Sequence, residues 1–275
     1  MRMAGHIRVL GTLAVAGALA LSGGSAIAAG SGMSKATAYT CAGGAIPSGT
    51  YASITVTGPA PCSVAEDAVV NVVGNISVAA GAFFDAQSVP STITVGHNVT
   101  GAADSLVGLG CQPPSLTGNS AHPCVDANNE PTEGASDITV NGNITITDAA
   151  LVALNGITVH GNVTLSGGGD PNPFAIPSFW TVKNNIVDRN VTVHGQSLEW
   201  IGVMFNEVGR NVTLTNIAVD DEHENAPGVY IVRNTVGRNL TCMGLTPGVS
   251  GGFVPGSVNV VGRNANGQCA DLVAP

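Results

Sequence analysis

The amino-acid sequence predicts an all-β protein in which most of the chain forms a single parallel β-helix, a solenoid of about eight or nine coils. Three observations lead to this prediction. A short motif occurs eight times at a period of about 22 residues. It consists of Val, any two residues, Asn and an aliphatic residue, usually followed by Thr. Apolar and polar residues alternate on both sides of each Asn, as in short strands. Strands this short cannot bury themselves, so the coils must stack.

The N-terminus has the features of a secretory signal peptide. Arg2 and Arg8 precede or adjoin an apolar run, Val9–Leu21, and the segment ends with the small residues of Ala26-Ile27-Ala28. Residues 1–28 are therefore expected to be removed on export, which leaves the mature protein secreted, extracellular or associated with the cell wall. No later stretch reaches the roughly 18 apolar residues of a membrane helix, so no membrane span is expected.

The mature chain is expected to have two parts. Residues 29–62 form an N-terminal cap region, and residues 63–275 form the β-helix with a disulfide-pinned C-terminal end. Six cysteines in an exported chain predict disulfides. Because only neighbouring coils touch in a solenoid, we expect sequential pairs: Cys41–Cys62, Cys111–Cys124 and Cys242–Cys269.

The Asn of the repeated motif marks a bend between two strands. Asn tolerates the left-handed backbone region, and stacked copies can hydrogen-bond to one another. We expect a ladder of Asn side chains at a buried corner, formed by Asn75, Asn98, Asn143, Asn162, Asn190, Asn211, Asn239 and Asn264. The interval from Asn98 to Asn143 is 45 residues, about twice the period, and is expected to hold two turns of the pattern.

Four stretches of the chain carry a resemblance to a known group of proteins. They are Ser91–Val99, Gly108–Pro114, Leu151–Val159 and Arg233–Cys242. In these stretches the chain resembles a family of uncharacterised exported actinobacterial proteins with a right-handed parallel β-helix. The resemblance implies that fold, its handedness and export, and it implies no activity. The general chirality of parallel crossover connections also predicts a right-handed coil.

The repeat changes character in the second half of the chain. Five positions before the bend, the early coils carry Val or Ile, whereas the late coils carry Asn185, Asn206, Asn234 and Asn259. The residue just before the bend becomes Arg in the same coils, which places four Arg residues in one column, the Arg stripe: Arg189, Arg210, Arg238 and Arg263. Like charges one coil apart, at about 5 Å, need carboxylates, solvent or a ligand between them.

Two interpretations of the Arg stripe are open. In the first, it binds an anionic polymer such as a uronic-acid glycan or a teichoic acid of the cell wall. In the second, the Arg stems cover apolar edges and their charged heads pair with carboxylates such as Asp188 and Glu207. The sequence favours the structural interpretation, because Arg recurs with the period of the fold itself.

The longer connections hold most of the acidic residues. Four segments are expected to leave the coil at one phase and crowd one flank of the solenoid: 111–131, 167–173, 220–227 and 246–256. One of them contains the candidate binding residues Asp220, Asp221, Glu222 and Glu224, whose oxygens are suitable for Ca²⁺. The run lacks the spacing of a dedicated calcium loop, so a solvated charge run is favoured and no cofactor or metal is expected. His97, His160 and His194 are expected to point outward near bends.

Composition limits the partners. A formal net charge of −9 makes nucleic acid an unfavourable partner for the surface as a whole. The favoured function is a structural or adhesive, glycan-binding role at the cell envelope or outside the cell, with a cell-wall or extracellular glycan as the expected partner. The sequence indicates no oligomeric state.

Two further functions are left open. A lyase or hydrolase of acidic glycans needs a carboxylate cluster and a basic residue in one cleft, and the acidic run at Asp220 with Arg210 or Arg238 supplies the residue types. Only two Trp residues, Trp180 and Trp200, are present, which argues against a wide aromatic groove for sugars, and no catalytic residue is assigned. Outward Thr columns allow an ice-binding solenoid, although unequal coil lengths are expected to spoil a flat face: Thr145, Thr164, Thr192 and Thr213.

Overall fold

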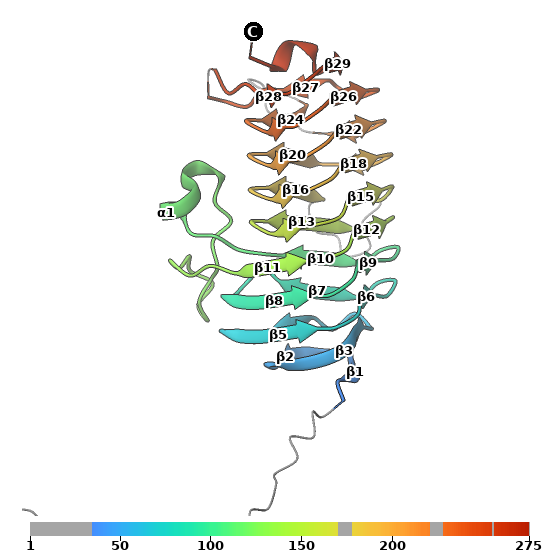
Figure 1. The fold of residues 1–275 in the computed structure, drawn as a ribbon, viewed down its shortest axis with the longest axis vertical. Coiled ribbons are helices and arrows are strands. Elements are labelled where there is room, and N and C mark those ends of the chain that lie inside the picture. The colour runs from blue at the N-terminus through green and yellow to red at the C-terminus, as the bar shows by residue number, and fades with distance from the viewer. Residues whose placement is uncertain (1–34, 170–177, 221–227, 255, 275) are drawn as a thin grey trace, which may run out of the picture. The chain divides into compact units, whose positions relative to one another are not determined.

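A computed structural model of the chain describes residues 35–169, 178–220, 228–254 and 256–274. These residues are nearly all β, and their strands pair in parallel in two large sheets (Figure 1). A typical coil contributes one strand to a nine-stranded sheet and two short strands, one on each side of the bend Asn, to an 18-stranded sheet. The predicted all-β, parallel solenoid is confirmed at this level. Its handedness stays a prediction.

The first two strands of the 18-stranded sheet are β1 (Thr37–Cys41) and β3 (Gly49–Val56). The strands that precede the bend are β5 (Ala68–Val72), β8 (Ser91–Val95), β11 (Asp137–Val140), β14 (Thr158–Val159), β17 (Ile186–Val187), β21 (Glu207–Val208), β25 (Thr235–Val236) and β28 (Val260–Val261). Those that follow it are β6 (Ile76–Val78), β9 (Val99–Gly101), β12 (Ile144–Thr147), β15 (Val163–Ser166), β18 (Val191–His194), β22 (Val212–Thr215), β26 (Leu240–Met243) and β29 (Ala265–Gly267).

The nine-stranded sheet contains β2 (Gly44–Ile46), β4 (Cys62–Val64), β7 (Phe83–Ala86), β10 (Leu106–Leu109), β13 (Leu151–Asn155), β16 (Phe179–Lys183), β20 (Trp200–Met204), β24 (Val229–Val232) and β27 (Val249–Ser250). Two further strands, β19 (Ser197–Leu198) and β23 (Ala218–Val219), pair with each other. The helical elements are α1 (Pro114–Thr117), η1 (Gly118–Ser120) and η2 (Ala270–Leu272).

The core is formed by the apolar residues that alternate with polar residues along the strands. In β15 the inward Val163 and Leu165 are fully buried, whereas Thr164 and Ser166 between and beyond them are partly exposed. Each inward residue lies beside the equivalent residue of the next coil. Val163 pairs with Val191, and Val191 pairs in turn with Val212. Most of the buried hydrophobic residues form one cluster that runs from Cys41 to Cys269, and Tyr230 and Val232 form a second, small one. Burial of each such Val or Leu side chain contributes roughly 1.5–3 kcal/mol.

The interval between Asn98 and Asn143 holds one coil, not the two that were predicted. Strand β9 pairs directly with β12, and the backbone N–H of Asn143 donates to Oδ1 of Asn98 at 2.9 Å. The additional residues leave the stack between β10 and β11 as an excursion, residues 110–136, that contains α1 and η1 (Figure 1). We call this excursion the insertion.

The long connections do not share one phase of the coil, so that expectation was wrong. The insertion and residues 251–258 follow strands of the nine-stranded sheet, β10 and β27. The connections that contain residues 167–173 and 220–227 instead precede strands of that sheet, β16 and β24. The long connections therefore occur at two different places in the order of the coil, before and after its strand in the nine-stranded sheet.

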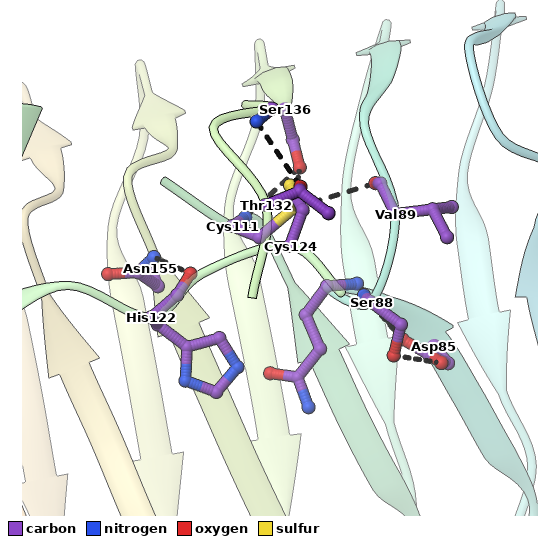
Figure 2. The surroundings of a disulfide bond; sticks show 11 residues. Asp85, Ser88, Val89, Cys111, His122, Cys124, Thr132, Ser136 and Asn155 are labelled. Atoms are coloured by element: carbon purple, nitrogen blue, oxygen red, sulfur yellow. Dashed lines mark hydrogen bonds between the residues drawn. A yellow bond between two sulfur atoms is a disulfide. The ribbon is translucent and has the colours of Figure 1, made fainter. Parts of the chain in front are cut away.

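The three disulfides have the predicted pairing. Cys41–Cys62 joins the first two coils, Cys242–Cys269 holds the end of the last coil, and Cys111–Cys124 closes the insertion (Figure 2). The described part of the expected cap region, residues 35–62, belongs to the stack, because β3 pairs in parallel with β5 and β6, and β2 with β4.

Candidate functional site

The bend Asn residues form the predicted hydrogen-bonded ladder. In the rungs from Asn75 to Asn239, Oδ1 of one Asn accepts from both the backbone N–H and Nδ2 of the Asn one coil further on. For Asn143 and Asn162 these distances are 2.8 and 3.0 Å. The ladder continues in both directions, from Asn75 to Asn264. In the last rung, Oδ1 of Asn239 accepts from the backbone N–H of Asn264. The backbone contact therefore repeats along the stack with the strand spacing of about 4.8 Å.

This ladder lies at the surface, so its predicted burial was wrong. Asn162, Asn190 and Asn211 are partly exposed, and Asn75 and Asn264 are exposed. The buried column is the one five positions earlier: Asn185 is 2% exposed, Asn206 and Asn234 are each 1% exposed, and Asn259 is 0% exposed. Its Asn side chains are also hydrogen-bonded from coil to coil, but in the opposite direction: Nδ2 of Asn185 donates to Oδ1 of Asn206, one coil further on, at 3.0 Å.

A column of Thr residues runs beside the bend Asn ladder. Thr164 in β15 pairs in register with Thr145 on one side and Thr192 on the other, and the column continues to Thr213 and Thr241. The pairing holds although successive bend Asn residues are 19 to 28 residues apart in these coils. The unequal coil lengths therefore do not break the register of the Thr column, because the surplus residues lie outside the strands that carry it.

Together the two columns line a shallow groove of about 460 Å³. The groove extends over five coils, and its lining consists of Asn and Thr alone: Asn143, Thr145, Asn162, Thr164, Asn190, Thr192, Asn211, Thr213, Asn239 and Thr241. Every rung offers a hydroxyl and an amide, which both donate and accept hydrogen bonds. We call this feature the polar groove.

The Arg stripe lies immediately beside the polar groove. Each Arg precedes a bend Asn, and its backbone N–H donates to the carbonyl of the Arg one coil earlier, from Arg210 to Arg189 at 2.9 Å and from Arg238 to Arg210 at 2.8 Å. All four side chains are exposed. The stripe therefore presents guanidinium groups in register along the second half of the groove.

The Arg guanidinium groups are not paired with the carboxylates that the structural interpretation predicted. Within the described ranges, the single ion pair joins Nδ1 of His160 to Asp188 at 2.7 Å, and neither Asp188 nor Glu207 is bonded to an Arg. His97, His160 and His194 are exposed, as predicted. In the part of the chain described here, the Arg stripe is left to solvent or to a ligand.

The acidic run does not form a site that can be described. Asp220 is exposed and has no ion pair to Arg210 or Arg238 in the described coils. Asp221, Glu222 and Glu224 lie outside the described residues. No group of three or more His, Cys, Asp or Glu side chains that could hold a metal is found among the residues that are described.

The insertion creates a second polar cluster that the sequence did not indicate. It lies on the outer side of the nine-stranded sheet, where Nδ2 of Asn155 donates to the carbonyl of His122 at 3.4 Å (Figure 2). Nζ of Lys183 donates to the carbonyl of Ala121 at 3.2 Å. Ser120 and Asn184 exchange two further hydrogen bonds, of 2.9 and 3.1 Å. These side chains dock the insertion onto β13 and β16.

Burial changes the acid–base properties of this cluster. It lowers the pKa of Lys183 to about 8, because the ammonium group loses water. Burial, together with the charge of Lys183, also lowers the pKa of His122 to about 4. Perturbed pKa values are typical of catalytic groups, but here both side chains belong to the contact that holds the insertion.

Comparison of the chain with protein-family models, with curated proteins and with solved structures finds no match. The resemblance to exported actinobacterial proteins therefore stays a prediction. Among the described residues, no helix combines the length and apolar character needed to cross a membrane.

Proposed function

We propose that this protein is an exported binding protein that holds an extended anionic glycan along the polar groove, with the Arg stripe recognising its acidic groups. The role is adhesive or structural, at the cell envelope or outside the cell. The observation that carries the proposal is the row of exposed Arg side chains beside the groove, none of which is ion-paired within the described part of the chain.

The repetition of the groove favours a polymeric ligand. The same Asn and Thr pair recurs in five consecutive coils. A linear glycan presents hydroxyl and acidic groups at regular intervals along its chain, so successive sugars can make equivalent contacts in successive coils. Each contact is individually weak, but several along one chain add to a useful affinity.

The chemistry of the two columns favours a glycan with acidic groups. Amide and hydroxyl side chains bond to sugar hydroxyls as both donors and acceptors. Arg binds carboxylate or phosphate through two parallel hydrogen bonds, and four Arg side chains one coil apart repel one another unless anions lie between them. Uronic-acid polymers and teichoic acids both provide such anions.

Cleavage of the glycan is the weaker alternative. A lyase or hydrolase needs a group that can take or give a proton at the bound sugar. The polar groove is lined by Asn and Thr, and none of these side chains titrates in the physiological range. The groove therefore has the composition of a binding surface.

The in-register Thr column favours ice binding as a second candidate function. Equivalent hydroxyls on Thr145, Thr164 and Thr192 lie one coil apart, as a face that orders water requires. The Arg stripe and the hollow between the columns argue against it. Thermal hysteresis of the purified protein, unaffected by Arg210→Gln, would favour ice binding over the proposed function.

The proposed function is tested with the double variant Arg210→Gln/Arg238→Gln. Binding of polygalacturonate to the wild-type protein should weaken as salt is added and should fall at least about tenfold in the double variant. Teichoic acid tested in parallel identifies the preferred anion, and neutral amylose is the uncharged control. The matched protein control is Arg233→Gln, which removes an exposed Arg that is not part of the stripe.

Melting temperatures decide between the two interpretations of the stripe. A folded double variant with an unchanged melting temperature and weakened binding supports the proposal. A double variant that binds both anionic polymers as well as the wild type does contradicts it, as does equal binding of amylose.

A further inference from the structure

The nine-stranded sheet carries an apolar cleft that is separate from the polar groove. It has a volume of about 220 Å³ and lies over the outward side chains of β20 and β24. Its walls include Trp200, Met204, Phe205, Tyr230, Val232 and Phe253. The sequence argued against an aromatic surface because Trp is rare. Trp180 is indeed in the core, whereas Trp200 is partly exposed in this cleft.

The cleft is built by close packing of three aromatic rings. The ring centroids of Trp200 and Tyr230 are 5.2 Å apart, and those of Tyr230 and Phe253 are 5.7 Å apart. Gly202 is in register with Tyr230 in the next coil, and a side chain at Gly202 would collide with the Trp200 ring and the end of Met204. The glycine therefore leaves room for the Trp200 ring to lie over the sheet.

Two excursions of the chain border the cleft. Asn119 comes from the insertion, and Phe253 comes from the connection between β27 and β28. Both excursions follow strands of the nine-stranded sheet, β10 and β27, and both project on the left in Figure 1. The cleft thus lies between two connections that leave the stack at one corner.

Among the described residues that line the cleft, the one charged side chain is that of Arg233. It directly follows β24, is exposed, and adopts a φ of 50°, a left-handed conformation that is uncommon for a residue with a side chain. Among the described residues it has no ion pair. The cleft therefore combines apolar and aromatic walls with one unneutralised positive charge.

We infer that this cleft binds a small aromatic carboxylate, with the ring against Trp200, Tyr230 and Phe253 and the carboxylate on Arg233. The volume is below the roughly 300–1,000 Å³ of pockets for drug-sized ligands, so the ligand is small. Aromatic rings favour other rings at such centroid distances. A sugar fits less well, because Asn119, Ser257 and Arg233 are the few polar side chains in the lining.

The inference does not rest on the proposed function, because the cleft and the polar groove belong to different sheets and share no lining residue. The test uses the full mature protein and calorimetric titration with 3-phenylpropanoate. The uncharged amide of the same acid, 3-phenylpropanamide, is the control ligand. The acid should bind at least about tenfold more tightly than the amide, because a charged hydrogen-bonded pair forms only with the acid.

Two variants assign the binding to the cleft. Arg233→Gln should remove the preference for the acid and leave binding of the amide unchanged, whereas the matched variant Arg238→Gln should change neither. Phe253→Ala removes an exposed aromatic wall without disturbing the core, and it should lower the affinity for both ligands. The chain has two Trp residues, so an emission change that is lost in Trp200→Phe places the ligand beside Trp200 and not beside the buried Trp180.

Three results would overturn the inference. The first is no binding of the acid to the wild-type protein. The second is equal binding of acid and amide, which indicates an apolar site without recognition of charge. The third is a Trp200 emission change with neutral phosphatidylcholine vesicles but none with the acid, which identifies the cleft as a membrane-docking surface.

Discussion

At the residue scale, Asn206 illustrates how a polar side chain is held inside the stack. Its Nδ2 donates to the carbonyl of Val182 and to Oδ1 of Asn234, both at 2.8 Å. Its Oδ1 accepts from Nδ2 and the backbone N–H of Asn185, at 3.0 and 3.1 Å. Because every polar atom of the amide is paired, an almost fully buried side chain is tolerated.

The first prediction compares the two Asn columns within one coil. Asn206→Ala should lower the free energy of unfolding by about 1–3 kcal/mol, because it leaves buried groups of Val182, Asn185 and Asn234 unpaired. Asn211→Ala, in the partly exposed bend ladder, should cost about 1 kcal/mol or less, because water can replace the lost bonds. Urea unfolding of the two variants measures the difference, and equal losses would show that burial does not separate the columns.

At the scale of elements, the insertion is the part of the chain that departs furthest from the repeat. The disulfide Cys111–Cys124 closes it, and hydrogen bonds from Asn155, Lys183 and Asn184 dock it on the sheet. Docking buries one ammonium group and one imidazole. The attachment of the insertion should therefore depend on pH.

The second prediction follows from the direction of the two pKa shifts. Between pH about 8 and 10.5, the unfolded chain keeps a proton on Lys183 that the folded protein has lost, so stability rises with pH in that window. Between pH about 4 and 6.5, the unfolded chain binds a proton on His122 that the folded protein does not, so stability falls as pH falls. Each pKa shift changes the free energy of unfolding by at most about 3 kcal/mol.

Urea midpoints measured across these windows test the second prediction. Lys183→Met should remove the alkaline rise, and His122→Gln should remove the acidic fall. The matched control is Lys35→Met, at an exposed position, which should leave both slopes unchanged. Persistence of both slopes in the Lys183 and His122 variants would refute the assignment.

At the scale of the whole described unit, residues 35–274, each coil contacts its neighbours in the stack. In such a structure stability is approximately a sum of terms for coils and for the interfaces between them. The terminal coils have one neighbour instead of two, and an exposed end strand can pair with another chain. The disulfides Cys41–Cys62 and Cys242–Cys269 lie at these two ends.

The third prediction concerns the C-terminal end. Cys242→Ala/Cys269→Ala should reduce the protection of amide hydrogens from exchange in β28 and β29, and protection in β15, β18 and β22 should be retained. The matched variant Cys111→Ala/Cys124→Ala should loosen residues 110–136 only. Loss of protection throughout the stack in the first variant would mean that the coils unfold as one unit.

The sequence by itself determined which residues stack on which. The period of the motif places Asn162 next to Asn190 and Thr164 next to Thr192. Proximity in consecutive coils made Cys41–Cys62 and Cys242–Cys269 predictable, whereas Cys111–Cys124 lies within the insertion. The contacts between coils depend on the repeat alone, because parallel strands in register bring each residue beside its own copy.

The tertiary structure alone decided which Asn column is buried, where the insertion leaves the stack, and what lies beside each charged group. Asn206 and Asn211 both recur with the period of the repeat, but the first is almost fully buried and the second is partly exposed. His160 and Asp188 occupy the same position in consecutive coils, whereas the cleft around Trp200 joins residues at unrelated positions in the period. Such contacts depend on the three-dimensional direction of side chains, and a one-dimensional repeat does not carry that information.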